Sequence, residues 1–130
     1  MLSTMISFGY RMVRTTDTRL LWKMAYNFGY KGMRSVQRFK ARLQQGKVFP
    51  PFLYISITNS CNLRCQGCWV DVDKPQSLIN FEDMNQLICN AKQHGNSFFG
   101  ILGGEPFLHP ELIRILKAHS DCYFQIFTNG

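Results

Sequence analysis

The chain has 130 residues, of which 45% are hydrophobic and 14% aromatic, a length and composition that allow a folded domain and exclude a disordered chain. The formal net charge of +7 is uneven, since residues 1–50 hold ten Lys and Arg side chains and one acid, Asp17, whereas residues 51–130 hold five basic and seven acidic side chains. The basic character belongs to the N-terminal segment, so nucleic-acid binding by the whole chain is not expected.

Targeting signals and disulfide patterns are both missing from the sequence. No apolar run approaches the roughly 20 residues of a membrane-spanning helix, and residues 1–10 lack the leading charges and cleavage site of a signal peptide. The five cysteines, an odd number with three clustered together, are not typical of a secreted disulfide framework. These features predict a cytoplasmic protein with a metal or iron–sulfur site.

Two basic amphipathic helices are predicted in the N-terminal segment. Apolar side chains recur three or four positions apart over residues 20–28 and nearly so over residues 33–43, which is the spacing of one helix face. Gly29 and Gly32 predict a break between the two helices. A glycine and two prolines within residues 46–51 predict the boundary with the next domain.

This basic extension, residues 1–50, admits three interpretations. The favoured one is that it packs against the rest of the protein with its charges solvated. The second is contact of residues 11–47 with an anionic membrane surface, which would bury Trp22, Phe28 and Phe39 and make the protein peripheral to the membrane. Nucleic-acid binding is disfavoured, because basic helices alone provide no reading motif.

Residues 51–130 alternate between short apolar runs and helical patterns. Buried strands are predicted over residues 52–57, 98–102 and 123–127, with helices from the N-cap Asn80 to about residue 94 and from Pro110 to about Ala118. This order predicts an α/β fold of parallel strands joined by helical crossovers. Three parallel strands are few for a sheet covered on both faces, so we expect a fragment of a longer protein.

Three cysteines, Cys61, Cys65 and Cys68, lie in the loop after the first predicted strand. The carboxyl ends of parallel strands are where open α/β sheets bind ligands. A [4Fe–4S] cluster normally takes four protein thiolates. Three thiolates would leave one iron with an open position, as in catalytic metal sites.

This cysteine spacing resembles the cluster loop of the radical S-adenosylmethionine (radical SAM) superfamily, and the resemblance covers about residues 52–130. Gly103-Gly104-Glu105-Pro106, after the second predicted strand, is similar to the superfamily's glycine-rich motif that holds the methionine moiety. Thr128-Asn129-Gly130, after the third, is also similar. Gly67 is a departure, because the residue before the third cysteine is often aromatic or apolar; Trp69 is the alternative surface for the adenine.

The resemblance implies a fold, a reaction and a site. Residues 51–130 would be the first part of a partial TIM-like (βα)6 barrel, truncated after its third strand. The reaction would be reductive cleavage of S-adenosylmethionine (SAM) to a 5′-deoxyadenosyl radical that abstracts hydrogen from an unknown substrate, with an electron donor such as flavodoxin or ferredoxin. The implied site residues are the [4Fe–4S] ligands Cys61, Cys65 and Cys68 and the SAM-binding residues Gly103, Gly104 and Glu105. Glycines allow close backbone approach, and the Glu105 carboxylate would pair with the amino group of SAM.

Two other functions remain open for these residues. A zinc-stabilised binding module would use His94 or His109 as a fourth ligand. A simple electron-transfer iron–sulfur protein would need a fourth cysteine, but Cys89 and Cys122 are far from the loop in sequence and are predicted to be packing residues. His94 is also predicted, with His119, to complement the C-terminus of a helix.

Overall fold

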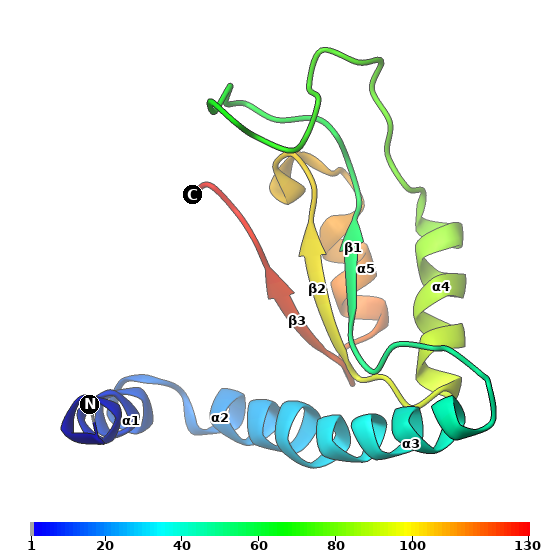
Figure 1. Ribbon diagram of the computed structural model, residues 1–130. Coiled ribbons are helices and arrows are strands. Elements are labelled where there is room, and N and C mark those ends of the chain that lie inside the picture. Colours follow the sequence, from blue (N-terminus) through cyan, green and yellow to red (C-terminus); the bar gives the residue numbers. More distant parts are fainter. Residues whose placement is uncertain (1) are drawn as a thin grey trace.

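The computed structural model describes residues 2–130. Its elements are α1 (Leu2–Thr15), α2 (Thr18–Met24), the π-helix η1 (Ala25–Lys31), α3 (Gly32–Gln44), β1 (Leu53–Ser56), α4 (Phe81–Gln93), β2 (Phe98–Leu102), the 3-10 helix η2 (Pro106–Leu108), α5 (Leu112–Ala118) and β3 (Tyr123–Ile126). The strands form one open sheet in the order β1-β2-β3, with both pairs parallel (Figure 1). The predicted α/β fold is confirmed, and the arrangement is consistent with the first units of a (βα) barrel.

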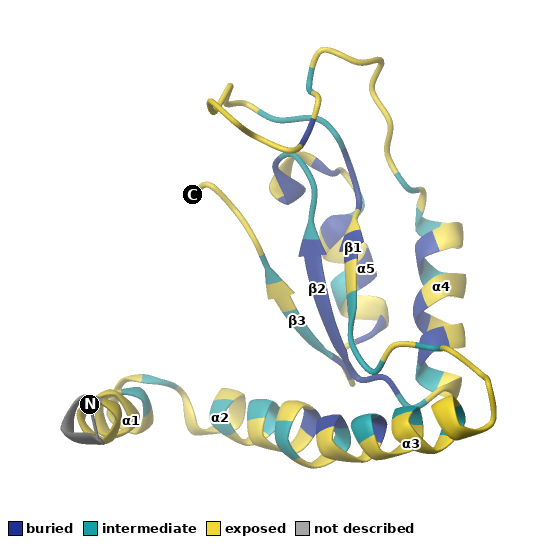
Figure 2. Ribbon diagram, viewed as in Figure 1, coloured by how far each residue is buried: buried dark blue, intermediate teal, exposed yellow. Residues whose placement is uncertain are grey.

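The hydrophobic core lies between one face of the sheet and the helices α4 and α5 (Figure 2). Its buried members come from the sheet and the segments next to its strands and from α4 and α5: Ile55, Ile57, Met84, Ile88, Ala91, Phe99, Ile101, Leu112, Ile115 and Cys122. Helix α4 begins as predicted, because the Asn80 side chain accepts a hydrogen bond from the Asp83 N–H at 2.8 Å.

The opposite face of the sheet is more open than the sequence predicts. Tyr54, Gly100 and Gln125 lie side by side in the register of the three strands. The Tyr54 ring covers Gly100, where a Cβ would overlap it, and is itself 58% exposed. The prediction that the first strand is buried is therefore wrong for this face, since only its helix-facing side chains are covered.

Helix α5 begins two residues later than predicted. The N–H of Glu111 donates to Nδ1 of His109 at 3.2 Å, and the N–H of Leu112 donates to the His109 carbonyl at 3.2 Å. These bonds hold a turn ahead of the helix. At its other end His119 is buried, and burial together with the charge of Lys92 holds the pKa of His119 below its ordinary value. A neutral ring does not supply the positive charge predicted for this helix end.

The N-terminal extension is more helical than predicted. Residues 2–15 form α1, where no helix was expected, and α2, η1 and α3 follow one another as one continuous helix (Figure 1). The predicted break at Gly29 and Gly32 is wrong, because Gly32 keeps helical dihedrals (φ −61°, ψ −46°). A Cβ at Gly32 would lie 3.5 Å from the Phe52 ring, so this glycine lets the helix approach the chain that leads into β1.

The long helix packs across the amino ends of the strands. The Ser97 hydroxyl donates to the Asn27 carbonyl at 3.1 Å, and the rings of Phe28 and Phe98 lie with centroids 5.2 Å apart. These contacts agree with the favoured interpretation of the extension. The division of the chain at residues 50 and 51 stays a prediction. Within residues 2–130, no helix combines the length and apolar character needed to cross a membrane.

Candidate cluster and cofactor site

The carboxyl ends of the three strands meet at one edge of the sheet, where the predicted site residues lie. The Gly104 N–H donates to the Thr58 carbonyl and the Glu105 N–H donates to the Ser60 carbonyl, each at 2.8 Å. The Gly-Gly-Glu turn is thereby hydrogen-bonded to the chain that enters the cysteine loop. Placement of these two motifs on one rim is what a shared site requires.

The cysteine loop folds around a hollow of about 350 Å³ that Cys61, Cys65 and Cys68 line together. Gly67 has φ +75°, a backbone conformation that favours glycine, which accounts for the departure at this position. Trp69 lines the same hollow and is 69% exposed. The thiols therefore share one open space with an aromatic side chain beside them.

The donor set of this loop, three thiols that line one hollow, is chemically suited to an iron–sulfur cluster. Within residues 2–130, no three His, Cys, Asp or Glu side chains converge closely enough to hold one metal ion. A [4Fe–4S] cluster instead offers a separate iron to each thiolate. The Cys61 sulfur accepts from the Leu63 N–H at 3.4 Å and from Nδ2 of Asn129 at 3.7 Å.

Glycine is required in the turn that faces the loop. A Cβ at Gly103 would overlap the Thr58 carbonyl oxygen, and one at Gly104 would overlap that of Ser60. Gly103 also has φ +150°. Within residues 2–130, the carbonyl oxygens of Gly103 and Gly104 accept no hydrogen bond.

The Glu105 carboxylate is buried and holds two strand ends together. It accepts from the Phe107 N–H at 3.0 Å, from the Thr128 hydroxyl at 2.9 Å and from the Asn129 N–H at 2.8 Å. Burial alone would raise the pKa of Glu105, but hydrogen bonds from the Asn129 and Phe107 N–H groups and from the Thr128 hydroxyl hold it below its usual value. The Glu105 carboxylate thus stays charged and holds the Gly-Gly-Glu turn to the residues that follow β3.

Sequence reasoning gave too little weight to the residues after β3. Asn129 donates from Nδ2 to Oδ1 of Asn62 at 2.9 Å as well as to the Cys61 sulfur, and its N–H reaches Glu105. It therefore contacts both predicted motifs. The only sequence signal was the short Thr-Asn-Gly ending, which is common on its own.

Replacing Glu105 with glutamine is expected to lower the free energy of unfolding at pH 7 by about 1–3 kcal/mol, because charge-assisted hydrogen bonds in a buried site are lost. A carboxyl group whose pKa is lowered on folding stabilises the fold above its unfolded-state pKa, and this contribution disappears as the pH falls through the folded-state value. Denaturant unfolding should therefore show a smaller difference in unfolding free energy between E105Q and the parent at acidic pH than at pH 7. A gap that did not change with pH would contradict this role, and the exposed Glu82→Gln variant is the control.

The alternative ligands of the cysteine loop lie elsewhere. His109 has both ring nitrogens occupied, Nε2 by the Ile79 carbonyl at 2.8 Å and Nδ1 by the Glu111 N–H. His94 stacks on a phenylalanine at the end of α4, near the amino ends of the strands. Cys122 is buried just before β3, also at that far edge, and burial raises its pKa to about 11. Cys89 is exposed on α4, so the prediction that it packs internally is wrong.

Fold and site together define a class: a parallel α/β protein with a three-cysteine loop and a glycine-rich turn at its ligand-binding edge. The family model described as the radical SAM superfamily matches residues 55–130. The chain belongs to the radical SAM superfamily. Its members are enzymes that use a [4Fe–4S] cluster and SAM, the two cofactors predicted from the sequence.

Curated relatives share this part of the chain. The GTP 3′,8-cyclase of Microcystis aeruginosa is 36% identical over 91 residues, which cover 61% of this chain and 27% of the relative. That of Campylobacter jejuni (strain RM1221) is 33% identical over 87 residues, with the same two shares. That of Synechococcus sp. (strain CC9605) is 36% identical over 66 residues, covering 51% of this chain and 19% of the relative. The chain thus spans about a quarter or less of these relatives.

Proposed function

We propose that this chain provides the cluster and SAM site of a radical SAM reaction. Cys61, Cys65 and Cys68 would hold a [4Fe–4S] cluster through three of its irons, leaving the fourth for SAM. Such a cluster would supply one electron for the reductive cleavage of SAM into methionine and a 5′-deoxyadenosyl radical, and that radical would abstract hydrogen from the substrate.

The observation that carries this proposal is the joining of the two motifs at one rim. Hydrogen bonds of 2.8 Å tie the Gly104 and Glu105 N–H groups to the chain just before Cys61. A cofactor bound at an open iron would therefore meet the free carbonyl oxygens of Gly103 and Gly104. These acceptors suit the amino group of SAM.

The same geometry refines the part played by Glu105. Its carboxylate accepts hydrogen bonds from three protein donors in this structure. We infer that Glu105 contributes mainly by positioning the turn, and that the backbone carbonyls beside it contact the amino group. The negative charge of Glu105 also makes the electrostatic potential at the turn more negative, which favours binding of a cation there.

Production of 5′-deoxyadenosine tests the proposal. The reconstituted protein is incubated without oxygen with SAM and a chemical reductant, and the nucleoside is quantified by chromatography. Formation of 5′-deoxyadenosine that requires both reductant and protein is expected. Unchanged SAM in the presence of a fully loaded, reduced cluster would instead favour an electron-transfer protein.

The proposal is confined to the radical step and assigns no substrate. The name GTP 3′,8-cyclase describes relatives of which this chain covers 19–27%. The shared stretch supports a shared way of generating the radical. The proposal also includes an electron donor of the flavodoxin or ferredoxin type, because the cluster must be reduced before each cleavage.

Contact with an anionic membrane surface is a further part of the proposal for residues 11–47. Trp22 is 75% exposed on a helix rich in basic side chains, whereas Phe28 packs against the rings of Phe52 and Phe98 and is less available. A Trp beside Lys and Arg is typical of helices that lie on anionic bilayers.

Replacing Trp22 with serine is expected to weaken binding to vesicles that contain phosphatidylserine by about tenfold, since burying a large apolar side chain contributes about 1.5–3 kcal/mol. Vesicle co-sedimentation measures this. Trp69→Ser is a matched control, because Trp69 is similarly exposed but lies in the cysteine loop. Equal loss in both variants would argue against a membrane contact through this helix.

A further inference from the structure

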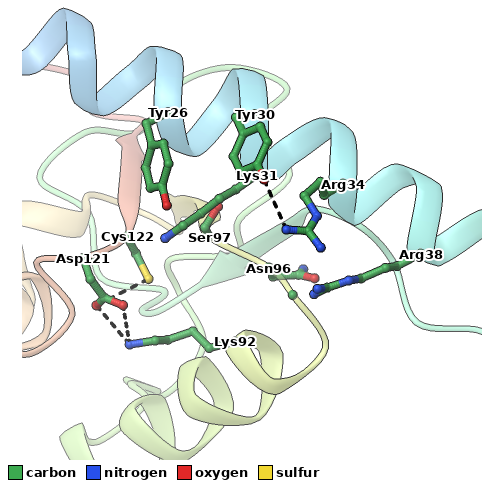
Figure 3. Close-up of a pocket in the computed structure, with 11 residues that line it drawn as sticks. Tyr26, Tyr30, Lys31, Arg34, Arg38, Lys92, Asn96, Ser97, Asp121 and Cys122 are labelled. Atoms are coloured by element: carbon green, nitrogen blue, oxygen red, sulfur yellow. Dashed lines mark hydrogen bonds and ion pairs between the residues drawn. The ribbon is translucent and has the colours of Figure 1, made fainter.

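A pocket of about 270 Å³ lies beneath the amino ends of the strands, at the opposite edge of the sheet from the cysteine loop. Figure 3 shows η1 and α3 on one side of it and the end of α4 with the segments before β2 and β3 on the other. Four cationic side chains line it: Lys31, Arg34, Arg38 and Lys92. The function proposed above does not use this pocket.

The positive charges of the pocket are largely uncompensated. Its lining contains one carboxylate, Asp121, and Nζ of Lys92 contacts both oxygens at 2.9 and 2.7 Å. Although burial acts to raise the pKa of Asp121, the hydrogen bond and charge of Lys92 hold it below its ordinary value, so this pair is fully ionised and satisfied. Within residues 2–130, the remaining three cations form no ion pair.

Aromatic side chains orient two of these cations without neutralising them. Nζ of Lys31 lies 5.0 Å from the ring centroid of Tyr26. The Arg34 guanidinium lies 5.8 Å from the centroid of Tyr30 and donates to its hydroxyl at 3.2 Å. The π-helical turn η1 brings Tyr26 and Lys31, five positions apart, to the same face. Cation–π contacts keep the full charge available to a ligand.

The third cation is placed by the turn that ends α4. The side chain of Arg38 crosses Gly95, and a Cβ at Gly95 would overlap the Arg38 guanidinium. Gly95 has φ +88°, so glycine is favoured there for the turn as well as for the space. The guanidinium therefore lies against the backbone at the rim of the pocket, and Figure 3 shows it beside Asn96.

We propose that this pocket binds an oxyanion of the phosphate class, either as a free phosphate or diphosphate or as the phosphate of a lipid headgroup. Arginine guanidinium groups match phosphate oxygens in pairs, and a lysine adds a point charge. A multiply charged phosphate balances three free cations better than a single carboxylate does. The volume is below the about 300–1,000 Å³ of pockets that enclose whole drug-sized ligands, so a small anionic group fits better than a larger ligand.

Titration calorimetry with inorganic phosphate and pyrophosphate, at constant ionic strength, tests this site in the chain. The variant R34Q/R38Q removes two pocket cations, and the charge-matched variant K40Q/K47Q removes two exposed lysines that do not line it. Affinity for pyrophosphate is expected to fall at least about tenfold in the first variant and to stay near that of the parent in the second. Circular dichroism melting checks that both variants fold.

Vesicles separate the two sources of phosphate. Co-sedimentation is compared for phosphatidylcholine alone and with phosphatidic acid added. A larger loss of binding to the anionic vesicles in R34Q/R38Q than in K40Q/K47Q, whose lysines also belong to residues 11–47, supports a lipid phosphate, whereas unchanged vesicle binding with lost pyrophosphate binding supports a soluble ligand. Equal behaviour of the two variants with both probes, or no binding of either probe by the parent, would overturn the proposal.

Discussion

Cys65→Ala is expected to abolish assembly of the iron–sulfur cluster and, with it, cleavage of SAM. Cys61, Cys65 and Cys68 line one hollow, whose lining within the described residues 2–130 contains no other cysteine and no histidine. Cys122 lies at the far edge of the sheet and Cys89 on the exposed side of α4. Loss of one of only three thiolates therefore removes a required cluster contact.

Iron and sulfide content after anaerobic reconstitution measures this effect, together with the broad visible absorption of the cluster. Cys89→Ala is the matched control, because it removes a solvent-exposed thiol outside the loop and is expected to leave the iron content unchanged. A C65A protein with the iron content and absorption of the parent would mean that the loop is not the cluster site.

Gly104→Ala is expected to disrupt the rim that joins the two motifs. The added Cβ would overlap the Ser60 carbonyl oxygen and lie 3.0 Å from that of Asn59, and both are backbone atoms. The turn must then move away and give up the bond from the Gly104 N–H to Thr58. Overpacking of this kind costs about 1–3 kcal/mol of unfolding free energy, and SAM binding should fall along with it.

Gly29→Ala provides the comparison for this variant. Apart from its chain neighbours and the nearby backbone of its own helix, no described atom lies within 4 Å of a Cβ at Gly29, so alanine there is expected to be neutral or to stabilise by about 0.4–1 kcal/mol. Denaturant unfolding measures both variants. If G104A proved as stable as the parent and still bound SAM, the close approach at this rim would not be needed.

The sheet and α4 could be predicted from the sequence because local signals agree there. The second predicted strand, residues 98–102, matches β2 in both bounds, and Asn80 caps α4 as expected. Short apolar runs separated by capped helices leave few alternatives to parallel pairing. Since the direction of the strands then fixes which loops share an edge, the meeting of the cysteine loop with the Gly-Gly-Glu turn could also be foreseen.

What could not be predicted depends on tertiary contacts. Gly32 signals a helix break by propensity alone, but the Phe52 ring that packs over it comes from a distant part of the chain. The partners of the Glu105 carboxylate, Thr128 and Asn129, lie more than twenty positions away. The basic pocket likewise forms only where η1 and α3 cross the amino ends of the strands, so the positions of the basic residues in the sequence do not reveal it.

The most direct test of the central claim is low-temperature electron paramagnetic resonance of the reconstituted, reduced protein, recorded with and without SAM. If Cys61, Cys65 and Cys68 hold the cluster as proposed, one iron is left open, and the signal of the [4Fe–4S]⁺ cluster is expected to change when SAM is added. A reduced cluster whose spectrum is identical with and without SAM would contradict the account.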